Sequence, residues 1–179
     1  MTERHPDQVI LGLADGHDAG ACLVVDGRVV AAVNEERLTG VKNYAGVPLN
    51  SIPEVLRLAN CDPLAVTAVA LATRGYLAGP VGGRGGLLHA SAGAALRIAS
   101  HTDLARVVMG TRQGVELMYV PLRLLRSRRV RAIRGYLKSL GVAAPISVLD
   151  HHLTHAASAY YTSGWDRCAV VTLDYWGDG

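Results

Sequence analysis

Short runs of β-branched and aliphatic residues dominate the first part of the chain and predict strands. One run covers Gln8 to Ala14, a second covers Ala21 to Val25, and a third covers Arg28 to Val33. The dipeptide Asp26-Gly27 separates the second run from the third, and this dipeptide between two β-prone segments is a strong hairpin signal. The chain is therefore expected to open with three strands, the last two paired as a hairpin.

A predicted helix and then a fourth predicted strand follow the first three strands. Ser51 predicts a helix N-cap, with Pro53 early in the helix and Glu54 at capping-box spacing. We expect this helix to end near Ala59. The compact apolar run from Thr67 to Ala72 then predicts a buried strand, which gives a β-α-β continuation.

The middle of the chain departs from this strand-rich pattern. Residues 75–86 contain six glycines and one proline, which indicates a loop. From Leu87 to about Leu140, apolar residues recur at helical intervals in several pieces. We therefore interpret residues 75–140 as a variable helical insertion within a single unit that spans residues 1–179.

A second set of elements follows the insertion. Ile146 to Leu149 has strand character, a helix is expected over about Thr154 to Tyr161, and Cys168 to Leu173 predicts a final buried strand. The loop after Leu173 is of a kind that another strand should follow, so we expect a truncation at Gly179. Together these elements predict an α/β fold with a mixed sheet flanked by helices.

Composition narrows the class of protein. Half of the 179 residues are apolar, so a substantial core can be buried. Uncharged apolar runs fall well short of the roughly 20 residues of a membrane span, and the first residues lack the layout of a signal peptide. The three cysteines are widely spaced without a CxxC pair, so neither a disulfide framework nor a zinc knuckle is indicated. We expect a cytoplasmic protein with no membrane partner.

The formal charge of +3 is unevenly distributed along the chain. Seven basic residues crowd into one short segment: Arg123, Arg126, Arg128, Arg129, Arg131, Arg134 and Lys138. Because apolar residues recur at helical intervals between them, we interpret the segment as an amphipathic helix with a solvated basic face. Contact with an anionic substrate or a second domain stays open, and no nucleic-acid partner is expected.

The loop between the first two predicted strands is the first candidate site. Its sequence runs from Asp15 to Gly20 and contains Gly16, His17 and Asp18. Small residues let backbone N–H groups approach a phosphate, and a carboxylate can orient a metal ion or water. The alternative is a surface turn with Asp and Gly in ordinary turn roles. We take Gly16 and Asp18 as candidate nucleotide- or phosphate-binding residues.

Three histidines within five residues form the second candidate site. His151 and His155 are four residues apart, which on a helix places both imidazoles on one face, where they can bind a single ion. The alternative is a packed first helical turn. His152 points elsewhere and is expected to be structural. Imidazole with carboxylate suits iron, manganese or zinc, so the spacing does not choose among these metals.

The third candidate site follows the last predicted strand. Asp174 is followed by a glycine-rich bend that contains Gly177, Asp178 and Gly179. A carboxylate with such a bend suits a divalent ion and phosphate oxygens, and the alternative is a plain hairpin turn. One phosphate-type loop after the first strand and another after a late strand is the layout of half of an actin-like ATPase fold, the ribonuclease H-like fold of actin and of acetate and sugar kinases.

The sequence also resembles a narrower family, the O-carbamoyltransferases of antibiotic and nodulation-factor biosynthesis. Their first domain is similar to the threonylcarbamoyl-transfer protein of tRNA modification. The resemblance lies in four stretches and is loose over the middle of the chain: Gly12 to Ala19, Asn34 to Thr39 with Lys42 and Pro48, His151 to Ala159, and Leu173 to Gly179.

This resemblance implies an ATP-dependent transfer of a carbamoyl group from carbamoyl phosphate, through a carbamoyl adenylate, to a hydroxyl of a small molecule. It implies a divalent metal held by His151, His155 and Asp174 and by a further acid that has no counterpart here, with Fe²⁺ first and Mn²⁺ or Zn²⁺ as alternatives, and ATP with Mg²⁺. The family's other half and its YrdC-like domain, which generates the adenylate, are not found in these 179 residues. The part present is expected to be inactive alone.

Two further residues receive catalytic roles. An unperturbed imidazole titrates near neutrality, so His17 is the candidate that orients or deprotonates the acceptor hydroxyl. Lys42 is the candidate that pairs with phosphate or the leaving AMP, and its alternative is an exposed loop lysine. Glu35, Glu36 and Arg37 are interpreted as a structural ion-pair cluster.

Two other functions stay open. One is a small-molecule kinase of the same fold, in which ATP donates phosphate and the histidines are structural. The other is a non-catalytic half-domain that serves as a binding module, because an actin-like site lies between two subdomains and one alone does not enclose a nucleotide.

Overall fold

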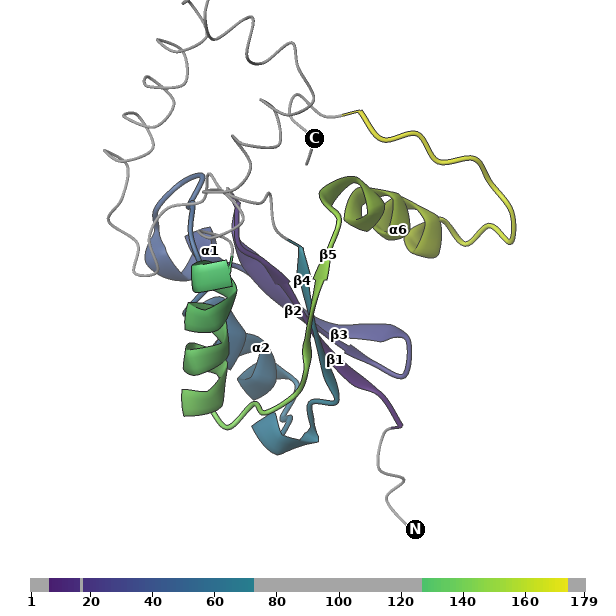
Figure 1. Cartoon of the computed structure of the whole chain (residues 1–179). Helices are drawn as coiled ribbons and strands as arrows, with labels where there is room; N and C mark the ends of the chain where they lie inside the picture. The colour runs from purple at the N-terminus through teal and green to yellow at the C-terminus, as the bar shows by residue number, and fades with distance from the viewer. Residues whose placement is uncertain (1–6, 17, 73–126, 174–179) are drawn as a thin grey trace, which may run out of the picture.

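A five-stranded mixed sheet forms the centre of the molecule (Figure 1). The computed structural model describes residues 7–16, 18–72 and 127–173. The strands lie in the order β3-β2-β1-β4-β5. β1 runs parallel to β4 and β4 parallel to β5, whereas β2 is antiparallel to both β1 and β3. Their bounds are β1 Val9–Ala14, β2 Gly20–Val25, β3 Arg28–Asn34, β4 Ala68–Ala72 and β5 Ile146–Leu149.

The predicted opening of three strands is confirmed. Asp26 and Gly27 join β2 to β3 with positive φ angles of 47° and 79°. Both turn positions of a type I′ hairpin need positive φ, and this turn matches the twist of the flanking strands. The turn is also tied to the sheet, because the Gln8 amide donates to the Asp26 carboxylate at 3.0 Å.

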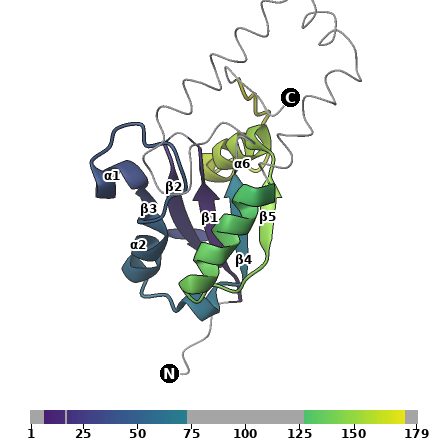
Figure 2. The ribbon, with the colours of Figure 1, turned by 60° about the vertical axis from the view of Figure 1, so that its left-hand side comes forward.

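Helices cover one face of this sheet. α1 spans Glu35–Thr39, α2 spans Ser51–Leu58 and a 3-10 turn spans Pro63–Ala65. A further helix covers residues 127–139, and α6 spans His151–Ser163. In both views α2 and the 127–139 helix lie beside each other on the same face, and α6 lies beyond the end of β5 (Figures 1 and 2). None of the described helices is long and apolar enough to cross a membrane.

The core lies between the sheet and these two helices. Its fully buried members include Leu11, Leu23 and Leu71 from the strands and Ile52, Val55, Ile133 and Leu137 from the helices. The amphipathic character predicted for the basic segment is confirmed over residues 127–139. Arg128, Arg131, Arg134 and Lys138 are exposed on that helix, while Ile133 and Leu137 are buried. The rest of the predicted 75–140 insertion, residues 75–126, lies outside the described residues.

The helix start at Ser51 was predicted with the wrong cap. The N-cap residue is Asn50, which makes no side-chain capping bond, and Ser51 is the first helical residue. The Ser51 hydroxyl donates instead to Glu35 at 2.7 Å. Glu54 does not close a capping box, since its carboxylate pairs with Arg57 at 2.7 Å. A carboxylate distant in sequence has replaced the local cap.

The end of the described chain differs from the prediction in two ways. α6 begins at His151 rather than Thr154, because Asp150 caps it and accepts from the Leu153 amide at 2.8 Å. Residues 168–173 form no strand, and the Leu173 side chain is 93% exposed. An apolar run becomes a strand only where another strand pairs with it, and within the described residues none pairs with this run.

Candidate functional site

Two of the predicted site segments follow parallel strands of the sheet. The loop from Asp15 to Ala19 follows β1, and Asp150 with α6 follows β5. Because β1, β4 and β5 are parallel, their carboxyl ends face the same edge of the sheet (Figure 1). In open α/β sheets, ligands bind outside the carboxyl ends of the strands. The fold therefore brings these two segments to the edge at which a ligand is expected.

His151 and His155 lie against each other on the first turns of α6. Their Nε2 atoms are 3.1 Å apart, and their ring centroids are 4.4 Å apart at an interplanar angle of 83°. His151 is buried with 9% of its surface exposed, whereas His155 is exposed. The prediction that a first helical turn places both imidazoles on one face is confirmed as geometry.

The Nε2 separation fits two ligands of one metal ion. Metal–nitrogen bonds of about 2.0–2.1 Å at tetrahedral or octahedral angles put two coordinating nitrogens about 2.9–3.4 Å apart. The same distance also fits an N–H···N hydrogen bond between two neutral imidazoles. Within the described residues no group of three or more His, Cys, Asp or Glu side chains could hold a metal. The predicted third ligand, Asp174, lies outside the described residues.

His152 takes a different position from its two neighbours. Its ring meets the His151 ring edge-on at a centroid distance of 5.7 Å. Its Nδ1 atom is buried and has no hydrogen-bond partner among the residues that the structure describes. The role predicted for His152 stays a prediction.

The loop after β1 is held by backbone hydrogen bonds at both ends. The Asp15 amide donates to the Ala72 carbonyl at 3.4 Å, and the Ala19 amide donates to the Tyr44 carbonyl at 3.1 Å. Those two amides are therefore not offered to a phosphate. The Gly16 carbonyl accepts from Gly46 at 3.1 Å. Asp18 is exposed and has a φ angle of 54°, while His17 lies outside the described residues.

The segment that lies over this loop carries Lys42. Lys42 is exposed, so its ammonium group is open to solvent beside the residues that contact the loop. The neighbouring amide of Asn43 donates to the Glu36 carboxylate at 3.0 Å, and Asn43 itself has a φ angle of 51°. The remaining predicted residues, Gly177, Asp178 and Gly179, lie outside the described residues.

Sequence reasoning missed an ion pair at the same edge. Arg129 of the 127–139 helix binds Asp15, with Nε at 2.5 Å from Oδ2 and Nη2 at 2.6 Å from the Asp15 carbonyl oxygen. The basic segment was interpreted as a solvated face, and this one arginine instead points into the protein. Nothing in its local spacing separates it from its exposed neighbours, since the signal is a contact between residues 114 positions apart.

The predicted ion-pair cluster after β3 is also different in the structure. Glu35 is fully buried and accepts hydrogen bonds from Asn50 and Ser51 at the start of α2. Burial, and then the Glu35 charge, raise the pKa of Tyr136. For Tyr44, burial and Glu35 raise the pKa, and the positive charge of Arg129 opposes them. Glu35 is thus part of a hydrogen-bonded network rather than an ion pair.

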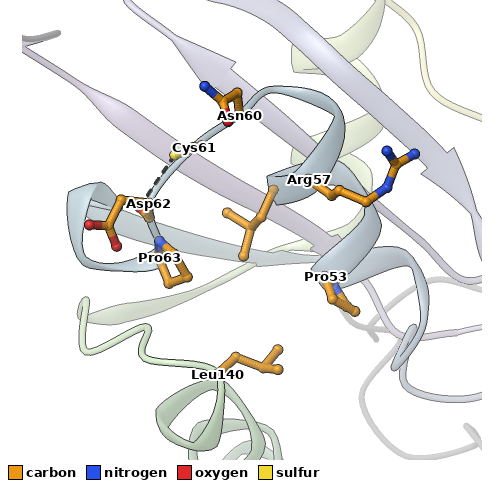
Figure 3. Close-up of a pocket in the computed structure, with 8 residues that line it drawn as sticks. Pro53, Arg57, Asn60, Cys61, Asp62, Pro63 and Leu140 are labelled. Atoms are coloured by element: carbon orange, nitrogen blue, oxygen red, sulfur yellow. Dashed lines mark hydrogen bonds between the residues drawn. The ribbon is translucent and has the colours of Figure 1, made fainter.

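A groove of about 500 Å³ lies away from these residues (Figure 3). Its apolar lining comes from Pro53 and Leu56 of α2, from Pro63 of the 3-10 turn and from Leu140, which follows the 127–139 helix. Cys61 also lines it and donates to the Asp62 carbonyl at 3.4 Å. Burial raises the pKa of the Cys61 thiol, and that of the Cys22 thiol likewise, so neither is an activated nucleophile.

Comparisons with known proteins connect the chain to longer relatives. No family model matches it. It is 31% identical over 185 aligned residues to the nodulation protein NolNO of Sinorhizobium fredii, an alignment that covers 99% of the chain and 22% of the relative. It is 30% identical to an uncharacterised protein of Synechocystis, over 94% of the chain and 26% of that protein.

A third relative matches a shorter part of the chain. The chain is 34% identical over 61 residues to an uncharacterised protein of Methanocaldococcus jannaschii, which covers 34% of the chain. The chain spans about a quarter of the length of the first two relatives. Nearly all of it is therefore similar to part of a nodulation protein.

Proposed function

We propose that this chain contributes the metal-binding part of an O-carbamoyltransferase. The observation that carries the proposal is the pair of imidazole nitrogens of His151 and His155, 3.1 Å apart at the carboxyl edge of the sheet. The resemblance to carbamoyltransferases of nodulation-factor biosynthesis predicted this pair as metal ligands. The match of nearly the whole chain to a nodulation protein supports that resemblance.

The sheet supports the finer fold assignment. The described elements follow the chain order β-β-β-α-α-β-α-β-α, with three parallel strands beside an antiparallel hairpin. That order agrees with one half of an actin-like ATPase fold, which was predicted from the positions of the two phosphate-type loops. On this proposal the nucleotide site lies at the sheet edge formed by the carboxyl ends of the parallel strands β1, β4 and β5.

The chain's own residues have distinct roles in this proposal. His151, His155 and Asp174 hold a divalent ion, with Fe²⁺ first and Mn²⁺ or Zn²⁺ as alternatives, and the bound ion supplies Lewis-acid polarisation of the carbamoyl oxygen. His17 accepts the proton of the acceptor hydroxyl as its oxygen bonds to the carbamoyl carbon. Lys42 pairs with the phosphate of AMP, which departs when its bond to that carbon breaks.

Several components of the reaction are proposed to lie outside these 179 residues. The relatives are about four times as long as the aligned part, which leaves room for a second half of the site and for an adenylate-forming YrdC-like domain. Carbamoyl phosphate and ATP with Mg²⁺ would be consumed by that domain. The small-molecule acceptor would be bound between the two halves, in the cytoplasm and without nucleic acid.

Metal and nucleotide binding to this chain test the proposal. Wild-type chain, His151→Ala and His155→Ala are titrated with Fe²⁺ under anaerobic conditions, and AMP binding is then measured by calorimetry with and without the metal. Carbamoyl transfer predicts metal binding that each histidine variant loses and AMP binding that the metal strengthens. If MgATP binds equally well to the wild-type chain and to both histidine variants, the kinase alternative is favoured. If neither metal nor nucleotide binds, a non-catalytic module is favoured.

A further inference from the structure

Arg129 and Asp15 form a buried ion pair between residues that are distant in sequence. Asp15 is fully buried, and only 12% of the Arg129 side chain is exposed. The guanidinium group binds both the side chain and the main chain of Asp15, through Nε to Oδ2 and through Nη2 to the carbonyl oxygen. One planar group therefore fixes the carboxylate and the peptide of the same residue.

Stability is a weak explanation for this pair. Removing two charges from water costs several kcal/mol per ion, and an apolar pair of similar volume is often as stable. The cost is not fully recovered here, because Asp15 Oδ1 is buried and accepts no hydrogen bond from any described residue. A buried polar atom without a partner needs an explanation other than stability.

Position offers that explanation. Asp15 is the residue at which β1 ends and the candidate phosphate loop begins. The loop's other anchors include backbone bonds from Ala19 to Tyr44, from Gly46 to Gly16 and from Glu35 to the Ala19 carbonyl. Arg129 adds an anchor from a helix that is distant in sequence. Without it, Asp15 itself would be held, among the described residues, by the strand and by the 3.4 Å bond from its amide to Ala72.

We propose that Arg129 and Asp15 are a positioning pair that fixes the β1–β2 loop against the 127–139 helix in the geometry that binds a phosphate. Neither residue touches the reacting atoms. The ordering of the loop is independent of any ligand, whereas its consequence for phosphate binding rests on the proposed function. The loop and the helix are thereby coupled, so a ligand that prefers the ordered loop stabilises their contact.

Arg129→Lys separates charge from geometry. Lysine keeps the positive charge beside Asp15 but is a point donor, so it cannot bind the carboxylate and the carbonyl as a planar fork does. Arg128→Lys is the matched control, because Arg128 is the adjacent residue of the same helix and is exposed. Arg129→Met with Asp15→Asn removes both charges and serves if the lysine variant is too unstable to measure.

Amide hydrogen exchange measures the ordering directly. In Arg129→Lys, the amides of Ala19 and Gly46 should exchange about tenfold faster or more, the size expected from losing one charge-assisted hydrogen bond. The core amide of Leu23 should keep its protection, and Arg128→Lys should change none of the three. Unchanged exchange at Ala19 and Gly46, or an equal acceleration at Leu23, would overturn the positioning role.

AMP binding separates this inference from the proposed function. If wild-type chain binds AMP, Arg129→Lys should weaken the binding about tenfold while Arg128→Lys leaves it unchanged. Equal affinity in all three proteins would contradict the coupling of the pair to the ligand. If wild-type chain binds no AMP, the proposed function fails, and the exchange rates at Ala19 and Gly46 still decide whether the pair orders the loop.

Discussion

Two fully buried carboxylates, Glu35 and Asp15, are bound in opposite ways. Glu35 accepts from the backbone amides of Asn50 and Ser51 at 3.0 and 2.8 Å, and from their side chains at 2.6 and 2.7 Å. Asp15 has a single cation, Arg129, and one carboxylate oxygen without a partner among the described residues. The first acid is fully satisfied, and the second is only half satisfied.

The difference separates a structural acid from a positioning one. Glu35 satisfies backbone donors at the start of α2 and places negative charge at the positive end of that helix. It therefore joins the end of β3 to α2 and has no capacity left for a ligand. Asp15 gains less from its surroundings, and what it does instead is fix the direction of the loop that follows β1.

Substitution of Glu35 should produce the largest effect. Glu35→Ala leaves the amides of Asn50 and Ser51 and the Ser51 hydroxyl without their buried acceptor, so we expect unfolding free energy to fall by about 3 kcal/mol or more. Urea unfolding followed by circular dichroism measures this loss. Glu36→Gln is the control, since Glu36 is partly exposed and, within the described residues, its carboxylate accepts from the Asn43 amide; it should cost about 1 kcal/mol or less.

The same isosteric change at the two acids sharpens the comparison. In Glu35→Gln the new NH₂ group faces hydrogen-bond donors, so we expect a loss of about 2–3 kcal/mol. In Asp15→Asn the NH₂ group can occupy the site of the unpartnered oxygen while the amide oxygen still accepts from Arg129, so the loss should be about 1 kcal/mol. Equal losses in urea unfolding, or a larger one at Asp15, would remove the distinction between the two acids.

Alkaline pH should weaken the network around Glu35. Burial, and then the Glu35 charge, raise the pKa of Tyr136 above its ordinary value of 10.0. A group with a raised folded-state pKa contributes stability that is fully present below its unfolded pKa, so stability should decline as pH rises above about 10. Tyr136→Phe should reduce this decline at the cost of about 1 kcal/mol, the value of the bond to the Leu49 carbonyl.

Absorbance at 295 nm reports tyrosine ionisation and tests the cause. Glu35→Gln should move the Tyr136 transition toward lower pH, because one of the two causes of its raised pKa is removed. A Tyr136 transition that stays in place in Glu35→Gln would show that burial alone sets the pKa.

The smallest stability effect is expected for His155→Gln. Because His155 is exposed, the substitution should change the unfolding free energy by no more than about 0.5 kcal/mol.

Local patterns predicted most of the described fold. The Asp26-Gly27 turn, the apolar strands β1 and β4, and the amphipathic spacing of Ile133 and Leu137 each depend on residues close in sequence. A helix from about Thr154 was predicted for the same reason, although its start at His151 and its Asp150 cap were not. These features depend on turn geometry and on periodic burial, which short segments contain.

Long-range contacts could not be predicted in this way. The contact of Ser51 with Glu35 joins residues 16 positions apart, and the contact of Arg129 with Asp15 joins residues 114 positions apart. The prediction of a strand at residues 168–173 was wrong, because strand formation needs a partner strand that a single segment does not specify. Of the candidate site, the spacing of His151 and His155 was informative because helix geometry alone brings them together.

The most direct test of the metal site is elemental analysis of the purified chain after anaerobic loading with Fe²⁺. We predict close to one equivalent of metal per chain in the wild type and in Ser158→Ala, an exposed position of the same helix. His151→Ala and His155→Ala should each lose it. Full retention of metal in both histidine variants would contradict the account and assign the 3.1 Å contact to a hydrogen bond between two imidazoles.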